Sequence, residues 1–445
     1  MRKKNLIRNF DLLLDEAIVK GQGIYLFTKN KKKYIDSTSG ITGANILGWG
    51  NKEIESQMIT QLKKIPFIDY KYFVDENRER LAKLILSKAE NNLDGVFFVG
   101  GAGSEACEAS MKLSYQYHYA KGKKEKKWII SRKQSYHGSG SDAMSLGDRK
   151  NLKIFKNFFP KFRAKINEHN IYRHRRNNES HEEYAERSAQ ELESKILQIG
   201  PKKVCAFVAE TIMGGLVGDV PPAKNYWKKV RKICDKYDVH LILDEVWCGT
   251  GTTGKSFCID YDGITPDFLF IGKTLAAGYS PVSAVITKRK ITDYINTKLG
   301  AIQISTTHQG HSLGISAALG VQKIIQNEKF LNKVRKNGEY FRKTVYSELQ
   351  GNSFFKNIRG RGLRNSLEYN CNNNHLFGQT LTDIAKNKFN LILSAKWHRV
   401  TFSQAINIST KDLDIIIDKF LSSYKYTQNN WSKLKKKERK LRNYY

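Results

Sequence analysis

Residues 266–279 read PDFLFIGKTLAAGY, an apolar run followed by glycine and lysine. An aromatic and aliphatic run, Phe268–Ile271, is closed by Gly272 and predicts a buried strand with Lys273 at its carboxyl end. In a mostly parallel sheet, the carboxyl ends of the strands face the crevice where ligands bind. An ammonium group is unfavourable there unless it is paired, deprotonated or used covalently. Lys273 is therefore the first candidate functional residue.

Apolar strands alternate with helices of about 10 to 15 residues through the middle of the chain. This alternation predicts a mostly parallel sheet covered by helices on both faces. The helices are expected at 104–117 and 225–238. The strands are expected at 95–99, 127–131, 204–210, 239–246, 268–272 and 282–287.

The two ends of the chain predict a smaller α+β domain. Residues 1–65 are expected to contribute an N-terminal segment with two short strands, and residues 66–312 form the large domain. Residues 313–430 add a linking helix and a C-terminal α+β part, in which Ser409 begins the last helix as its N-cap. Residues 431–445 are mostly charged and are expected to form a frayed or disordered basic tail.

The formal net charge of +33 raises the question of an anionic partner. The 76 basic residues are scattered, and the sequence has no zinc-finger spacing, RNP-like aromatic strand or basic-region heptads. A solvated basic surface is therefore favoured over a nucleic-acid site. Six cysteines without a CxxC pair indicate reduced thiols in the cytoplasm, not a zinc site. Acidic residues at 11, 15 and 16 interrupt the first apolar run, so no signal peptide is expected, and no 18-residue apolar stretch predicts a membrane span.

The turn after the first strand of the large domain is rich in glycine. It reads GGAGSEACEA over 100–109 and leads into a helix that begins near Ser104. Backbone without side chains allows a phosphate to approach closely, and the unpaired amides at a helix N-terminus can donate hydrogen bonds to it. A tight strand-to-helix turn also needs glycine, so the motif alone leaves both interpretations open. It is neither a Walker motif nor a GxGxxG fingerprint, which disfavours a nicotinamide cofactor.

A second candidate lies at the end of LILDEV, where Asp244 and Glu245 follow a buried strand. Side chains alternate along a strand, so only one of the two faces the crevice. A buried carboxylate needs a metal, an arginine or a protonated ring nitrogen, or it caps a neighbouring helix. No DxD or HxxH companion supports a metal. A phosphate-binding turn, an acid and the amine of Lys273 match the three reactive or polar groups of pyridoxal 5'-phosphate (PLP): its phosphate, its pyridine nitrogen and its aldehyde.

The segment from about Asp36 to Thr410 resembles the class III aminotransferases, a PLP-dependent group of fold type I that includes omega-amino acid and ornithine-type enzymes. The motifs that carry the resemblance are GAGSEACEAS, SYHGSG, FVAETIMGG, LILDEVWCGTGTTGKSF, PDFLFIGKTLAAGYSPVSAVI and THQGHSLGISAAL. It implies an α/β fold with a mostly parallel seven-stranded sheet sandwiched by helices, a smaller α+β domain, and PLP as cofactor.

The resemblance also implies roles for the catalytic residues. Lys273 forms the Schiff base with the cofactor and shuttles the substrate proton. Asp244 holds the proton on the pyridine nitrogen, and Glu210 stands near the substrate entrance.

The same resemblance implies cofactor contacts. Val246 and Tyr136 pack on the two faces of the ring, and His137 with Gly138 shapes the turn. Gly103 and Ser104 bind the phosphate, joined by Thr307 from the partner subunit of a homodimer. Taken without the family pattern, Tyr136 is an ordinary core aromatic residue and His137 a structural histidine.

Several positions depart from the family pattern. Trp247 replaces a glutamine that commonly approaches the phenolic oxygen of the cofactor, Thr252 replaces a frequent arginine, and Thr211 replaces a proline. The C-terminal arginine that holds a substrate carboxylate is replaced by Thr401. Arg399 lies two residues earlier on the same strand face and is a candidate substitute.

These features predict a transaminase that moves an amino group from an amine or amino acid, omega-amino acids included, to a keto acid such as pyruvate or 2-oxoglutarate. Two alternatives remain open at this point. One is another PLP reaction of the same fold, a decarboxylase, racemase or aminomutase. The other is a weakly active PLP-fold protein that binds anionic polymers through its basic surface.

Overall fold

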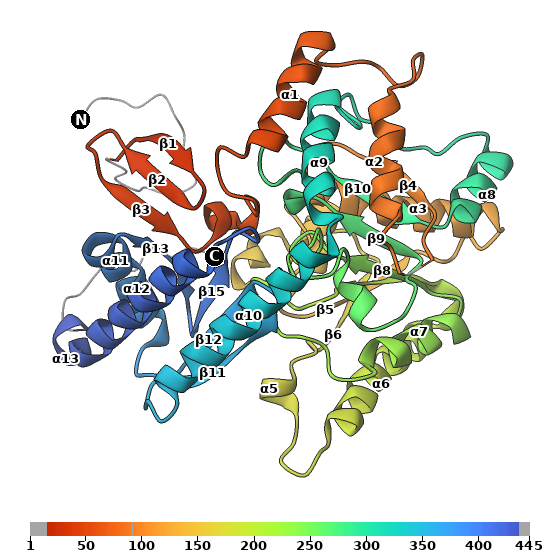
Figure 1. Ribbon diagram of the computed structural model, residues 1–445. Coiled ribbons are helices and arrows are strands. Elements are labelled where there is room, and N and C mark those ends of the chain that lie inside the picture. The colour runs from red at the N-terminus through yellow and green to blue at the C-terminus, as the bar shows by residue number, and fades with distance from the viewer. Residues whose placement is uncertain (1–15, 91, 436–445) are drawn as a thin grey trace.

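A seven-stranded sheet forms the centre of the computed structural model, which describes residues 16–90 and 92–435 (Figure 1). The strand order is β4-β10-β9-β8-β7-β5-β6. Only β10 runs antiparallel to its neighbours within this described sheet, so the prediction of a mostly parallel sheet is confirmed. The strands are β4 (Gly95–Phe98), β5 (Trp128–Arg132), β6 (Arg163–Ile166), β7 (Val204–Glu210), β8 (His240–Asp244), β9 (Phe268–Ile271) and β10 (Ala284–Thr287).

Helices cover both faces of this sheet because its strands are apolar on both sides. In β9, Phe268 and Phe270 join one core cluster, whereas Leu269 and Ile271 join the other. The first cluster includes residues of α3 (Gly103–Ala120), α4 (Ser141–Leu146) and α8 (Arg289–Leu299). The second includes residues of α6 (His181–Ile199), α7 (Tyr226–Lys236) and α9 (Ser312–Ile325), and α9 also packs on α1 (Lys52–Lys64) and α2 (Glu76–Leu86).

Two four-stranded sheets build the rest of the described chain. Their orders are β1-β2-β3-β13 and β11-β12-β15-β14. The N-terminal strands lie beside α11 and α12 in space, although they are far apart in sequence (Figure 1). The strands are β1 (Ile18–Gln22), β2 (Tyr25–Thr28), β3 (Lys33–Asp36), β11 (Phe355–Arg361), β12 (Arg364–Tyr369), β13 (Leu391–Ile392), β14 (Ser394–Lys396) and β15 (Arg399–Ser403).

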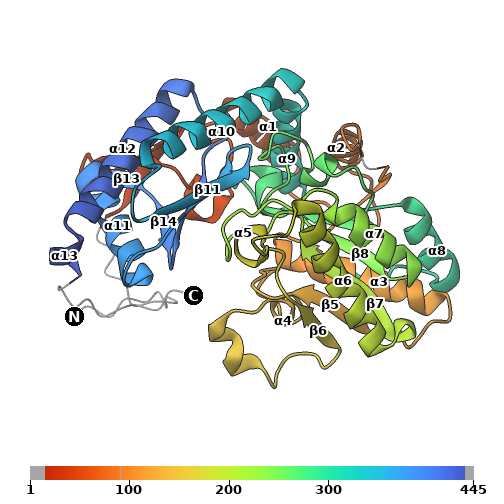
Figure 2. The same ribbon diagram turned by 90° about the horizontal axis from the view of Figure 1, so that it is seen from below.

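Helices connect and cover these sheets. α10 contacts α9 at one end and lies beside α12 (Figure 2). The longer helices here are α10 (Glu328–Leu349), α11 (Asn374–Phe389) and α12 (Thr410–Asn429). The short helical segments of the chain are η1 (Ser39–Gly43), η2 (Lys150–Phe155), α5 (Ile171–His174), η3 (Pro201–Lys203), η4 (Cys258–Tyr261), η5 (Lys273–Ala276) and α13 (Trp431–Leu434).

The structure adds local detail to these predictions in three places. Residues 390–394 are divided at Leu393 between two sheets, because β13 pairs with β3 while β14 pairs with β15 in the other sheet. Strand β6, on the sheet edge, was not predicted. The basic tail begins later than expected, since Trp431 starts α13 and its ring packs 5.3 Å from that of Phe377.

Two further expectations concern the ends of the chain. The signal-peptide argument at residues 11–15 and most of the basic tail, 436–445, lie outside the described residues. The predicted N-cap is confirmed, because the Ser409 hydroxyl accepts a hydrogen bond from the Asp412 amide at 3.0 Å. No helix in the described part of the chain combines the length and apolar character needed to cross a bilayer.

Candidate active site

A cavity of about 450 Å³ lies at the carboxyl ends of β7, β8 and β9. Strands β14 and β15 of a smaller sheet complete its wall. Thr307 does not line it and is exposed. The other predicted site residues all line the cavity: Gly103, Ser104, Tyr136, His137, Glu210, Asp244, Val246 and Lys273.

Lys273 begins η5, two residues after the last residue of β9. Its φ of 41° lies in the left-handed region, an uncommon conformation for lysine that is concentrated at functional sites. Burial and the positive charge of Arg364 lower the pKa of the Lys273 amine to about 8, although Asp244 and Glu210 act in the opposite direction. The amine is therefore half neutral near pH 8, which suits a nucleophile or a proton carrier.

Asp244 faces the cavity and Glu245 does not, as the alternation of β8 requires. The Asp244 carboxylate lies 2.8 Å from His137 Nδ1 and accepts a hydrogen bond from the Val246 amide at 2.9 Å. His137 is buried, and its Nε2 has no hydrogen-bond partner. This contact makes His137 more than an isolated structural histidine, because it orients the carboxylate.

Glu245 is the carboxylate that caps a helix. It accepts hydrogen bonds from the amides of Cys258 and Ile259, both at 2.7 Å, at the start of η4. The Thr211 hydroxyl donates to it at 3.1 Å. Thr211, one of the departures from the family pattern, therefore has a structural partner.

Glu210 ends β7 and lies opposite Asp244 of β8. It is only 6% exposed and lines the cavity. Burial, followed by the negative charge of Asp244, raises the pKa of Glu210 to about 8. Glu210 therefore carries a proton at neutral pH.

Replacement of Glu210 by Gln is expected to change how stability depends on pH. The pKa of this carboxyl is close to the ordinary glutamate value of 4.5 in the unfolded chain and about 8 in the folded protein, so the folded state binds more protons between these values. Stability from this group is present below pH 4.5 and is lost as the pH rises to about 8. In cofactor-free protein, the free energy of unfolding measured with urea should fall less between pH 5 and pH 8 for Glu210→Gln than for wild type. Exposed Glu125→Gln is the control, and equal losses in all three proteins would contradict the assignment.

The phosphate cradle predicted at 100–109 also forms part of the cavity. Helix α3 begins at Gly103, and its N-cap residue, Ala102, supplies no side-chain hydrogen bond to the first turn. A Cβ built on Gly103 would lie 2.8 Å from a methyl carbon of Val246, so only glycine fits at this contact. Ser104 Oγ accepts a hydrogen bond from the Ser139 amide at 2.9 Å. The free first-turn amides and the dipole of this 18-residue helix suit a phosphate group.

Trp247, which departs from the family pattern, is held by a buried network of hydrogen bonds and ring contacts. Its indole Nε1 donates to Asp219 at 2.7 Å, and the Ser366 hydroxyl donates to the other oxygen of Asp219 at 2.6 Å. The guanidinium carbon of Arg364 lies 4.2 Å from the centroid of the indole ring, and Lys273 Nζ lies 5.1 Å from it. A Cβ on Gly43 would meet the same indole at 2.3 Å. Trp247 thus fills a space shaped for it beside Lys273.

Arg364 and Asp219 were not singled out from the sequence. Arg364 is 1% exposed, and its Nη2 donates to the Gly43 carbonyl at 2.7 Å, while Nε and Nη1 have no partner. Nothing in the local pattern RGRGLRNS distinguishes this arginine from its neighbours at 359 and 361. Its effect on Lys273 follows only from the fold.

Replacement of Arg364 by Met should raise the pKa of Lys273 from about 8 toward the ordinary lysine value of 10.5, because the largest charge effect that lowers it is removed. Methionine preserves a long apolar contact with Trp247. The test is the pH dependence of Lys273 acetylation by acetic anhydride in cofactor-free protein, followed by peptide mass spectrometry. Exposed Arg80→Met is the control. An unchanged midpoint would contradict the role of Arg364.

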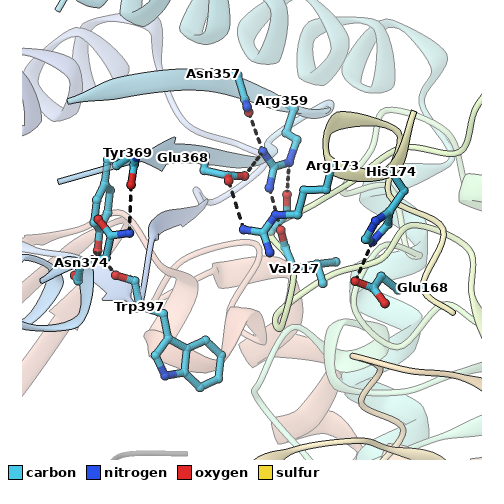
Figure 3. Close-up of polar contacts among 12 residues, drawn as sticks. Glu168, Arg173, His174, Val217, Asn357, Arg359, Glu368, Tyr369, Asn374 and Trp397 are labelled. Carbon is cyan, nitrogen blue, oxygen red and sulfur yellow. Dashed lines mark hydrogen bonds and ion pairs between the residues drawn. The ribbon is translucent and has the colours of Figure 1, made fainter. Parts of the chain in front are cut away.

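Arginines of the small sheet hold the loop 214–219 that carries Asp219. Arg359 donates from Nε to the Gly218 carbonyl at 2.7 Å and from Nη2 to the Val217 carbonyl at 2.6 Å (Figure 3). Its Nη1 pairs with Glu368 at 2.7 Å, and Glu368 also accepts a hydrogen bond from Arg173 at 3.0 Å. The loop is therefore fixed to β11 through its main chain.

The two positions considered for binding the substrate carboxylate lie on β15, where Arg399 and Thr401 both line the cavity. Arg399 is 1% exposed and donates to the Gly215 carbonyl. The Thr401 hydroxyl oxygen lies 3.3 Å from that of Ser366, whose proton is donated to Asp219. Thr252, another departure, does not line the cavity, and its hydroxyl donates to the Gly249 carbonyl at 2.9 Å. Among residues 16–90 and 92–435, no group of three or more His, Cys, Asp or Glu side chains is placed to hold a metal ion.

The fold and the cavity together define a fold-type-I, PLP-dependent transferase. The observations that fit the cofactor are an uncapped helix start for its phosphate, a buried carboxylate for its ring nitrogen, and an amine of lowered pKa for its aldehyde. All three face one cavity.

Comparison with known proteins identifies the family. The class-III aminotransferase family model matches residues 11–423. An uncharacterized aminotransferase of Schizosaccharomyces pombe is 37% identical over 353 residues, which cover 79% of this chain and 76% of that one. Putrescine–pyruvate aminotransferase of Pseudomonas aeruginosa is 32% identical over 354 residues, with 79% and 76% covered. The omega transaminase of Pseudomonas jessenii in complex with PMP superimposes with a TM-score of 0.87 at 28% identity, and 93% of each chain is covered.

The chain belongs to the class-III aminotransferase family, and the protein is a PLP-dependent transaminase. The resemblance inferred from the motifs is thereby confirmed.

Proposed function

We propose that this transaminase carries an amino group from an amine or amino acid to a keto acid with Lys273, Asp244 and Glu210 as its catalytic residues. The observation that carries the proposal is the convergence of Lys273, of lowered pKa, with the His137-oriented Asp244 in one cavity. PLP, when bound, supplies an electron sink that stabilises the charge left on the substrate carbon as its proton departs.

Each residue has a physical task in this proposal. The first-turn amides of α3, with Ser104, would bind the phosphate, and Val246 and Tyr136 would contact the ring. Asp244 would hold the proton on the ring nitrogen, because a carboxylate fixed by His137 favours the charged form of its partner. Lys273 would carry the proton between the substrate carbon and the cofactor. Protonated Glu210 provides a hydrogen-bond donor in the wall without adding negative charge.

We propose further that two copies of the chain form the working enzyme. Apolar side chains of the segment between α1 and α2 are exposed, including Phe67 (38%), Tyr72 (82%), Phe73 (63%) and Val74 (86%). A surface of this kind favours burial against a partner. Thr307 is exposed and does not line the cavity of its own chain, which supports its assignment to the phosphate site of the partner subunit.

We propose that the chain divides into a large domain, 66–312, and a small domain built from 313–430 together with 1–65. The pairing of N-terminal β3 with C-terminal β13 supports this division, because it joins the two ends in one sheet. We propose a cytoplasmic location, supported by six free cysteines, of which only Cys371 is not fully buried.

The proposed reaction is tested by single-turnover experiments on the PLP-loaded protein. With a panel of amines and amino acids, transamination predicts one carbonyl product and one pyridoxamine phosphate per active site, and a keto acid should then restore the starting spectrum. Release of carbon dioxide with the cofactor unchanged would instead indicate a decarboxylase. Inversion of an amino acid without a carbonyl product would indicate a racemase.

A further inference from the structure

One arginine joins two surface segments that lie far apart in the sequence. Arg78, in the first turn of α2, donates from Nε to the Gly310 carbonyl at 2.9 Å and from Nη2 to the Gln309 carbonyl at 3.2 Å. Nη2 also donates to the Ile68 carbonyl at 3.3 Å. Arg78 therefore holds the turn 306–310 and the segment between α1 and α2 together through their main chains.

The turn 306–310 carries Thr307, and its base is fixed to the central sheet. The Gly310 amide donates to the Val99 carbonyl, just after β4, at 3.0 Å. The φ of Gly310 is 59°, in the left-handed region that favours glycine. Thr307 is exposed, whereas Gln309 and Gly310 are buried. The turn thus presents Thr307 at the surface from a fixed base.

Side chains of the segment between α1 and α2 add contacts to the same turn. The Tyr70 hydroxyl donates to Gln309 Oε1 at 2.8 Å, and the Arg78 guanidinium carbon lies 5.2 Å from the centroid of the Tyr70 ring. The rings of Phe67 and His308 meet edge to face, with their centroids 5.9 Å apart. Phe67 belongs to the exposed apolar surface that we assign to the subunit contact. The turn and this surface therefore form one packed unit.

A guanidinium group suits this task because its donors form a rigid planar fork. One arginine reaches carbonyls of two segments at once, whereas the single nitrogen of a lysine does not reproduce this geometry. Charge-assisted hydrogen bonds to the carbonyls remove alternative conformations of the turn before a ligand arrives. Helix α9, which begins at Ser312 soon after the turn, packs on α2 and supports the same arrangement (Figure 1).

We propose that Arg78 is a positioning residue for the phosphate site of the partner subunit. It fixes the turn that presents Thr307 and ties this turn to the apolar surface of the subunit contact, so that association of two chains and completion of the phosphate site occur together. This inference rests on the proposed function, in which Thr307 reaches the cofactor's phosphate across the subunit contact. It deepens that function by naming the residue that controls how Thr307 is delivered.

Mixed dimers test the proposal, because Arg78 should act on the site of the opposite subunit. Two differently tagged chains are purified together, and one of them carries Lys273→Ala. Only the chain with Lys273 can form the lysine adduct of PLP, so the visible absorbance reports the affinity of one known site. The reference dimer pairs a wild-type chain with a Lys273→Ala chain.

The position of Arg78→Met within the mixed dimer decides the outcome. Placed in the Lys273→Ala chain, it should weaken PLP binding at the reporting site at least about tenfold, because that site receives the loosened turn. Placed in the chain that carries Lys273, it should leave the affinity equal to that of the reference dimer. A loss confined to the chain's own site, equal losses in both arrangements, or no loss in either would overturn the proposal.

A milder variant and a matched control complete the test. Tyr70→Phe removes only the hydroxyl that holds Gln309, and it should reproduce the effect on the opposite subunit at about threefold. If Arg78→Met does not yield a folded dimer, Tyr70→Phe decides alone, and an unchanged affinity in both of its arrangements overturns the proposal. Arg80→Met, exposed on the same helix, should change the affinity in neither arrangement.

Thr307→Ala separates this inference from the proposed function. If Thr307→Ala weakens PLP binding only at the opposite subunit's site while Arg78→Met and Tyr70→Phe do not, the inference fails and the shared phosphate site stands. If Thr307→Ala has no effect on the opposite site, or if sedimentation shows a monomer, the shared site and the inference fail together. Transfer of an amino group by Lys273, tested by single-turnover product formation, is independent of both results.

Discussion

Lys273→Ala is expected to abolish transamination, with a fall in kcat of at least about 10³-fold, because it removes both the nucleophile and the proton carrier. The side chain is held just beyond the end of β9 within the cavity, where the charges of Asp244 and Glu210 act on its amine; the charges that act on Lys396, the other lysine of the described lining, are those of Arg399 and Arg149. The measurement is single-turnover product formation together with the visible spectrum.

The spectrum distinguishes loss of chemistry from loss of fold. Lys273→Ala should still bind PLP through the phosphate cradle and Asp244, but its absorption should match free aldehyde and not a lysine adduct. Exposed Lys298→Ala in α8 is the matched control and should behave as wild type. Turnover near the wild-type rate in Lys273→Ala would refute the assignment of the lysine.

Asp244→Asn is expected to slow proton removal from the substrate by about 10²–10³-fold while the fold is retained. The amide fills the same space beside His137, but it carries no charge to hold the proton on the ring nitrogen. The loss should fall on kcat more than on KM, since the charge develops during the reaction.

A second readout follows from the charge of Asp244. Because Asp244 raises the pKa of Lys273, the variant should shift the midpoint for Lys273 acetylation in cofactor-free protein to lower pH. Asp293→Asn, on the exposed side of α8, is the control and should change neither the rate of proton removal nor the pH midpoint of Lys273 acetylation. An unchanged proton-removal rate in Asp244→Asn, measured with substrate deuterated at the reacting carbon, would show that the ring proton is held by another group.

The sequence predicts the central sheet well, and all but one of the residues that it assigns to the site line the cavity, because both depend on local patterns. The apolar run before Lys273 marks β9, and alternation in β8 shows that one of two adjacent carboxylates must face the cavity. The pattern does not say which one. That choice depends on η4, whose amides engage Glu245 and leave Asp244 for His137.

The groups that sequence reasoning missed come together only through long-range folding. Arg364 approaches Trp247 from a strand more than a hundred residues away, and Arg149 and Lys396 line the cavity from segments that lie far apart in the sequence. The division at Leu393 escaped prediction for a similar reason, since the partners of a short strand are chosen by the sheet edges available to it. Local periodicity carries no information about such contacts.

The clamped loop 214–219 also limits how this pocket can evolve. The carbonyls at 215, 217 and 218 each accept a hydrogen bond from an arginine on a strand of the small sheet. An inserted or deleted residue would move these carbonyls out of reach and leave buried guanidinium groups without acceptors. We therefore expect a change of loop length to disrupt this wall of the cavity, whereas exchange of a lining side chain that does not hold the loop, such as that at 396, leaves the loop in place.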